Sequence, residues 1–206
     1  MHSHSLLQFF SARDIQKFEY VPLGPFTAKN FATTVSPWIV STAALDPFRS
    51  KAPDQLLAEV VPYLAHSEEG RRRETYDIDL EVTIAAGAGA ADPQPSETLT
   101  TRSNFKHLYW TLDQMLAHHT VTGCNTRPGD LLATGTITGS REDAMSYGSL
   151  LEKTWGGTRT FDLAGNGGQR KYLEDGDRVT MTGKCVKDGL RIGFGKCTGL
   201  VLPANK

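Results

Sequence analysis

Hydrophobic and polar residues alternate most regularly between Tyr76 and Ile84. Every second residue in this stretch is apolar, and the residues between them are acidic or threonine. Successive side chains of a strand point to opposite faces, so a strand that is buried on one face has this period of two. We therefore predict a half-buried strand over 76–84.

A helical period follows between Asn104 and His119. The apolar residues of this segment recur at intervals of three and four, at Phe105, Leu108, Tyr109, Leu112, Met115 and Leu116. This spacing places them along one side of a helix, and Ser103 has a side chain suited to an N-cap. We predict the longest helix of the chain here, with its apolar side buried.

The remaining pattern consists of short strand-like runs between turn residues. Arg127–Asp130 predicts a turn before a strand at Leu131–Ile137, and the glycine-containing segments 166–168 and 187–189 predict hairpin turns. Further strands are predicted at 158–163, 170–173, 178–186 and 190–194. Ala85–Pro95 is predicted as a surface loop and Glu68–Glu74 as a charged turn. The expected fold class is a single domain, mainly β with some α.

Composition and charge argue against several classes of protein. The 206 residues carry 22 Lys and Arg against 23 Asp and Glu, and this balance argues against a nucleic-acid partner. No run of apolar residues is long enough for a membrane span, and the first ten residues lack the basic start and cleavage site of a signal peptide. Three cysteines without a paired motif favour a reduced, cytoplasmic protein.

Candidate chemistry gathers in the segment Ser11–Pro37. Arg13 and Gln16 are three residues apart, on one side of a helix, and Lys29 follows among aromatic residues and prolines. Such donors suit an acidic small molecule that develops negative charge. A solvated helix followed by a proline-rich loop explains the same residues equally well.

A second candidate is the carboxylate series Asp77, Asp79 and Glu81, which a strand would place on one face. Carboxylates are preferred ligands of calcium and magnesium. The polar outward face of an amphipathic strand is the favoured interpretation.

Several longer motifs carry a resemblance to a known family. They are SARDIQ, EYVPLGPF, TTVSPW, DIDLEV, SNFKHLYWTLDQMLAHHTVTGCNTRPGDLLATGTITG, YGSLLE and DGLRIGFGKCTGLVLPA. Through them, residues 11–204 resemble the C-terminal catalytic domain of the fumarylacetoacetase family, whereas residues 1–10 match nothing in that family.

The resemblance implies a mixed β-sandwich roll, a homodimer and a cytoplasmic hydrolase of tyrosine and phenylalanine catabolism. The implied reaction is metal-dependent hydrolysis of a carbon–carbon bond in 4-fumarylacetoacetate, which releases fumarate and acetoacetate, and the implied cofactors are calcium and magnesium. Carried over by motif, the catalytic residues are Arg13, Gln16, Lys29 and Glu152. Gln16, Tyr20 and Thr136 are the substrate contacts, and Lys29 and Thr33 flank a metal site. These residues are expected to line one concavity.

The chain departs from the family at its start. The family's metal carboxylates and catalytic histidine come mostly from sequence before the SARD motif, and Phe9 and Phe10 stand where the family has an Asp–Trp pair. The alternative hypothesis is therefore an inactive fragment that keeps part of the substrate pocket and a dimer surface. On this basis the chain alone is expected not to cleave the substrate. A related ketolase, decarboxylase or isomerase is disfavoured by EYVPLGPF.

Overall fold

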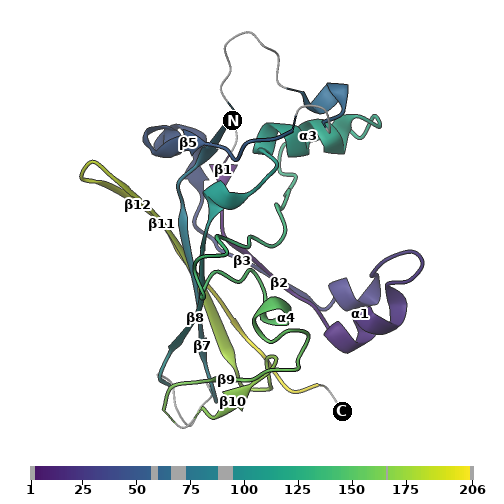
Figure 1. Ribbon diagram of the computed structural model, residues 1–206, viewed down its shortest axis with the longest axis vertical. Coiled ribbons are helices and arrows are strands. Elements are labelled where there is room, and N and C mark those ends of the chain that lie inside the picture. The colour runs from purple at the N-terminus through teal and green to yellow at the C-terminus, as the bar shows by residue number, and fades with distance from the viewer. Residues whose placement is uncertain (1–2, 57–59, 66–72, 88–94, 166, 205–206) are drawn as a thin grey trace.

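A four-stranded antiparallel sheet forms the centre of the molecule, in the order β12-β11-β7-β8 (Figure 1). The computed structural model describes residues 3–56, 60–65, 73–87, 95–165 and 167–204. The sheet comprises β7 (Asp79–Ala85), β8 (Thr98–Asn104), β11 (Arg178–Lys187) and β12 (Leu190–Leu200). The described chain is mainly strand with a few short helices, which confirms the predicted fold class.

Shorter elements surround this sheet. The two-stranded pairings are β1 (Ser3–His4) with β4 (Val40–Ser41), β2 (Leu7–Phe10) with β3 (Ala32–Val35), β5 (Arg49–Lys51) with β6 (Glu74–Tyr76), and β9 (Phe161–Asp162) with β10 (Gln169–Arg170). The α-helices are α1 (Arg13–Glu19), α2 (Thr42–Leu45), α3 (Leu112–Thr120) and α4 (Leu150–Lys153). The 3₁₀ turns are η1 (Thr27–Lys29), η2 (Asp46–Phe48), η4 (Pro62–Leu64) and η5 (Phe105–His107). Within the described ranges, none of the helices has the length and apolar character needed to cross a bilayer.

The main core lies where β11 and β12 meet the elements around α2. Leu45, Phe48, Phe194 and Cys185 are almost fully buried there. A second cluster packs Ile84 of β7 against neighbouring strands. The aliphatic and aromatic residues that the sequence spaces at alternate positions thus supply the buried faces of the sheet.

The predicted strand over 76–84 is divided in two. Tyr76 ends β6, which pairs with β5, and Asp79 begins β7, which pairs with β8 and β11. Between them the Asp77 amide donates to the Phe48 carbonyl, so the chain changes partners at this point. The apolar residues do face the interior: Tyr76, Ile78 and Ile84 are buried, and Leu80 and Val82 are partly buried against the two core clusters.

The predicted helix over 104–119 is wrong in its first half. Asn104 ends β8 and its side chain accepts a hydrogen bond from the Lys106 amide, which starts η5 instead. The α-helix begins after Thr111, where Thr111 and Gln114 form a capping box. Phe105 is buried, and Leu108 and Leu112 pack against the main core, so the apolar spacing is real although no continuous helix joins them.

Other strand predictions also change. Leu131–Ile137 pairs with no strand among the described residues, and Leu131 is 62% exposed. The predicted strands at 158–163 and 170–173 reduce to β9 and β10, whereas β12 runs beyond the predicted 194 to Leu200. The hairpin turn at 187–189 is confirmed: Asp188 and Gly189 have φ values of 50° and 77°, as a two-residue hairpin turn requires.

Some predictions fall on residues that the structure does not describe. The charged turn at Glu68–Glu74 and the loop at Ala85–Pro95 lie largely outside the described residues, as does Asn166 of the predicted turn at 166–168.

The strands β2 and β3 form a ribbon that carries α1 and η1 away from the main sheet (Figure 1). Phe9 pairs with Thr33 in this ribbon, and Phe10 pairs with Ala32. Its register fixes where the chain leaves for α1 and where it returns after Lys29. This ribbon therefore positions most of the predicted site residues.

Candidate functional site

Three of the predicted donor residues lie together on the α1–η1 segment (residues 11–29). Nη1 of Arg13 donates to Oε1 of Gln16 at 2.9 Å, as their spacing of three on a helix allows. Nζ of Lys29 donates to Oγ of Ser11 at 2.7 Å and lies 5.1 Å from the centre of the Phe9 ring. The segment thus gathers a guanidinium, an ammonium and an amide.

The charges of this group favour the binding of an anion. Burial and the nearby Arg13 guanidinium together hold the pKa of Lys29 below its ordinary value. Within the described residues, neither Arg13 nor Lys29 forms an ion pair with a carboxylate. A bound acidic group would offset the repulsion between these two neighbouring cations, which have no carboxylate partner among the described residues.

Among the predicted site residues of the segment Ser11–Pro37, Tyr20 and Thr33 are the two whose side chains are exposed. Tyr20 is the C-cap of α1, where its amide donates to the Gln16 carbonyl at 3.0 Å, and its side chain is 51% exposed. Thr33 lies in β3 with an exposed side chain.

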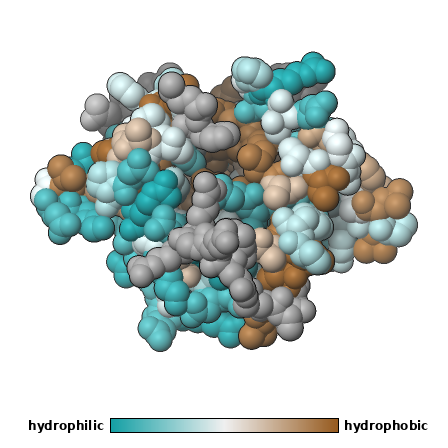
Figure 2. Space-filling view, turned by 90° about the horizontal axis from the view of Figure 1, so that it is seen from above, coloured by the Kyte–Doolittle hydropathy of each residue, from teal (hydrophilic) through white to brown (hydrophobic). Residues whose placement is uncertain are grey.

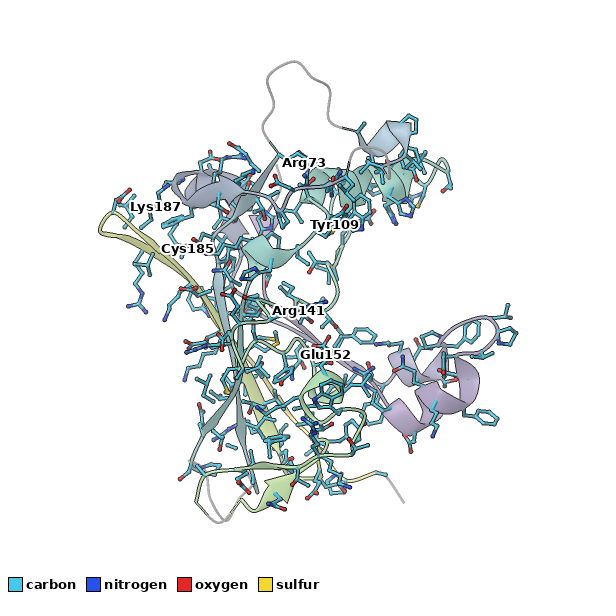
Figure 3. The ribbon with its side chains drawn as sticks, viewed as in Figure 1. Arg73, Tyr109, Arg141, Glu152, Cys185 and Lys187 are labelled. Carbon is cyan, nitrogen blue, oxygen red and sulfur yellow. The ribbon has the colours of Figure 1, made fainter. Side chains whose placement is uncertain are left out.

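Thr136 and Glu152 form a second group beside α4. The hydroxyl of Thr138 donates to both Glu152 carboxylate oxygens, at 2.9 and 3.0 Å, and the Gly148 amide donates to Oε2 at 2.8 Å. A Cβ at Gly148 would collide with the Thr136 methyl group, so these segments are in close contact. Figure 3 shows Glu152 on the same side of the long strands as α1.

The structure brings together Arg13, Gln16 and Lys29, and separately Thr136 and Glu152. Across the described part of the chain, no hydrogen bond or ion pair joins the two groups. One shared concavity for all six residues therefore stays a prediction. Three further residues bond to these groups and were not singled out from the sequence, because their partners are set by tertiary contacts: Ser11, Thr138 and Gly148.

The expected metal site does not fit the residues at hand. Among the residues that the structure describes, no three His, Cys, Asp or Glu side chains are grouped as metal ligands. Lys29 could offer a cation only its carbonyl, since an ammonium has no lone pair. Calcium and magnesium prefer several carboxylate oxygens, which this group lacks.

The carboxylate series on β7 is occupied by protein donors. Asp77 and Asp79 both accept from Nδ2 of the Asn104 side chain, at 2.6 and 3.0 Å, and Lys106 forms an ion pair with Asp77 at 3.1 Å. These contacts support the interpretation as a polar outward face rather than as a cation site.

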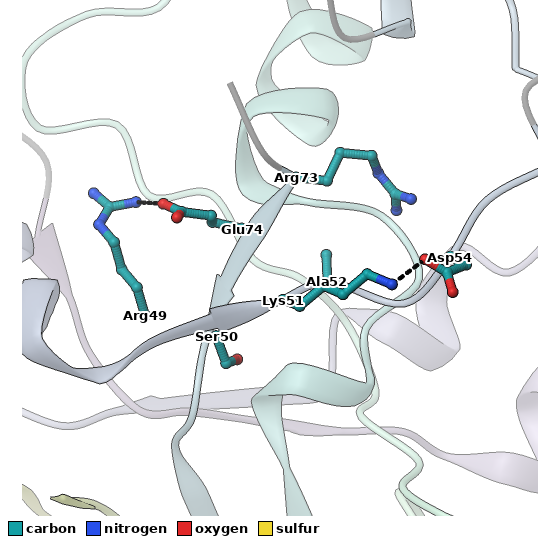
Figure 4. A pocket seen from close by; sticks show the side chains of 7 residues that line it. All are labelled: Arg49, Ser50, Lys51, Ala52, Asp54, Arg73 and Glu74. Carbon is teal, nitrogen blue, oxygen red and sulfur yellow. Dashed lines mark hydrogen bonds and ion pairs between the residues drawn. The ribbon is translucent and has the colours of Figure 1, made fainter. Parts of the chain in front are cut away.

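A surface pocket lies elsewhere, around β5 and β6 (Figure 4). Its lining includes two ion pairs, Arg49 with Glu74 at 3.1 Å and Lys51 with Asp54 at 2.7 Å. None of the predicted site residues lines it. Its charges are largely paired internally, so the α1–η1 segment remains the better candidate for binding an acidic ligand.

Comparison with known proteins places these residues in a family. The profile described as fumarylacetoacetate (FAA) hydrolase C-terminal matches residues 5–201. Proteins named fumarylacetoacetase from Arabidopsis thaliana and Homo sapiens are 51% and 52% identical to this chain over 199 residues. One from Dictyostelium discoideum is 50% identical over 202 residues. These matches cover 97–98% of the chain, which spans 44% of the length of each of these three relatives. The chain belongs to the fumarylacetoacetate hydrolase C-terminal family.

Proposed function

We propose that this chain carries the donor part of a fumarylacetoacetase-type site, which hydrolyses a carbon–carbon bond of 4-fumarylacetoacetate to give fumarate and acetoacetate. Arg13, Gln16 and Lys29 would stabilise the negative charge that develops on the substrate. Tyr20 and Thr136 would contact the substrate. The proposal rests on the relatives, which are named fumarylacetoacetase, and on the motifs that this chain shares with the family.

One observation of the structure carries the proposal: the convergence of Arg13 and Lys29 without a carboxylate partner in the described residues. An enolate or a carboxylate placed there would accept hydrogen bonds from both cations. Gln16 already bonds to Arg13 and would add a neutral amide donor at the same place.

No metal-dependent step is assigned to the side chains of this chain. The residues that the structure describes do not provide a ligand set for calcium or magnesium. Every role proposed for this chain is therefore the binding of substrate, or the stabilisation of its developing charge, by the chain's own side chains. Lys29 and Thr33 would at most border a cation that is held by other residues.

A second candidate function, binding without turnover, is favoured by the contacts of Glu152. The resemblance assigns this carboxylate to orienting a catalytic histidine, yet both of its oxygens accept hydrogen bonds from Thr138, and one also accepts from Gly148. We propose that the chain by itself binds acidic ligands of the substrate class and does not cleave the substrate.

The partner and location are part of the same proposal. Hydrophobic residues lie at several places on the surface (brown in Figure 2), and on the α1–η1 segment Phe18 is 91% exposed and Leu23 is 80% exposed. Exposed apolar surface often marks a subunit interface, which agrees with a homodimer. We propose a cytoplasmic homodimer, with residues 11–204 as the family domain.

The binding test is a titration of the whole chain with fumarate, followed by NMR. We expect Arg13→Ala and Lys29→Ala each to weaken the affinity about tenfold, which corresponds to about 1.4 kcal/mol. Lys17→Ala is the matched control, because Lys17 is an exposed cation on the same helix. Equal losses for all three variants would mean that only net charge attracts the ligand, and would contradict the proposed site.

A further inference from the structure

The carboxylate of Glu19 connects the end of α1 to the start of η1. Its Oε1 accepts from the amides of Phe26 and Ala28, each at 2.8 Å. Its Oε2 accepts from the amide and the hydroxyl of Thr27, at 3.1 and 3.0 Å. Four donors from three consecutive residues therefore meet one side chain.

This arrangement takes the place of a missing cap. The N-cap residue of η1, Phe26, has no side-chain capping bond, so the first amides of η1 need another acceptor. Burial alone would raise the pKa of Glu19, but the bonds from Ala28, Phe26 and Thr27 outweigh it and hold the pKa below its ordinary value. The acceptor is thus a charged carboxylate.

A second connection closes the other end of the segment. The Ala12 amide donates to the Ala28 carbonyl at 3.1 Å, and Lys29 reaches Ser11 at 2.7 Å. Ala12 directly precedes Arg13, and Ala28 directly precedes Lys29. The two donor residues are therefore each one residue away from an anchored position.

Holding two cations close together costs free energy, because like charges repel. Burial, together with the same repulsion from Arg13, lowers the pKa of Lys29. Neither cation has a carboxylate ion-pair partner within the described ranges, so the backbone anchors must resist this repulsion. Glu19 supplies the strongest of them, since its bonds are made to a charged acceptor.

We propose that Glu19 is a positioning residue that holds Lys29 beside Arg13 by fixing residues 26–28 against α1. The inference rests on the proposed function, in which Arg13 and Lys29 together bind an acidic ligand. Glu19 itself donates nothing to a ligand, and its effect passes through the backbone to Lys29.

The test compares Glu19→Gln with Asp14→Asn in the full chain. Glu19→Gln keeps the size of the side chain but turns one acceptor oxygen into an amino group that faces backbone donors. Asp14→Asn removes the same charge from an exposed position of the same helix. For Glu19→Gln we expect about tenfold weaker fumarate binding. We also expect the Lys29 pKa, followed by NMR of its side chain, to return toward 10.5. Asp14→Asn should change neither measurement.

The two measurements separate this inference from the proposed function. If the unmodified chain does not bind fumarate, the proposed function fails, while the Lys29 titration still tests the role of Glu19. An unchanged Lys29 pKa in Glu19→Gln, with α1 and η1 intact by backbone NMR, would overturn the inference. If Glu19→Gln does not fold, Thr27→Val removes the hydroxyl bond to Glu19, and it should shift the Lys29 pKa in the same direction by less. No shift in that variant would equally overturn the inference.

Discussion

We expect Lys29 to set the pH range over which the candidate site binds an anion. Its ammonium binds an anion only while it is protonated, and burial and Arg13 hold its pKa below the ordinary 10.5. We therefore expect fumarate affinity to fall, as pH rises, from a pH below 10.5. A titration series across pH measures this fall. Lys29→Arg should abolish it, because arginine stays charged over the same range. A fall that persists in Lys29→Arg would show that another group is titrating.

A single buried carboxylate anchors the C-terminal part of the fold. Asp177 has no exposed surface and accepts from the Arg170 guanidinium at two contacts of 3.1 Å. Asp177→Ala leaves Arg170 largely buried without this partner and should lower the free energy of unfolding by about 3–5 kcal/mol. Urea denaturation measures the change. Asp175→Ala, at an exposed neighbour, should stay within about 0.5 kcal/mol of the unmodified chain.

At the scale of single residues, the sequence predicts local pairs well and distant pairs poorly. Arg13 and Gln16 are three residues apart in a helix, so their contact follows from helix geometry. Glu152 meets Thr138 across a separation of 14 residues, and nothing in either residue's local pattern indicates the other. Their contact depends on a chain path that periodicity does not encode.

At the scale of elements, α3 shows that a helical spacing of apolar residues can extend beyond the helix itself. Phe105 and Leu112 fit one helical side, yet Phe105 belongs to η5, and the non-helical residues 108–111 separate η5 from α3. The capping box of Thr111 and Gln114 competes with a continuous helix and fixes the start at Leu112. Periodicity indicates which residues are buried, whereas the capping residues determine where the helix begins.

The capping box gives an element-scale prediction. The Thr111 hydroxyl accepts from the Gln114 amide, and the Gln114 side chain accepts from the Thr111 amide at 3.0 Å. Thr111→Ala removes the first bond and should lower the free energy of unfolding by about 1 kcal/mol. Thermal or urea unfolding measures this. Asp113→Ala, in the same first turn, is the control, and a loss as large there would mean that the bond from the Thr111 hydroxyl is not the specific cause.

For the whole molecule, the alternating runs were sufficient to predict a mainly β fold with β11 and β12 as a hairpin. They did not predict the β2–β3 ribbon that carries the α1–η1 segment, because these strands are short and their partners lie across an intervening helix. The family resemblance supplied the site residues that composition and spacing left open. It is the structure that shows Arg13 and Lys29 sharing one anchored segment.

The measurement that tests the central claim most directly is cleavage of 4-fumarylacetoacetate by the purified chain, with calcium or magnesium present. Loss of the substrate's ultraviolet absorbance reports cleavage. Because the described residues group no three metal ligands and Glu152 bonds to Thr138 and Gly148, we predict that the absorbance stays constant. Turnover on the order of 1–10³ s⁻¹ that a chelator abolishes would contradict this claim. The metal would then be held by carboxylates that bond to protein donors in this structure, with Asp77 and Asp79 the first to test.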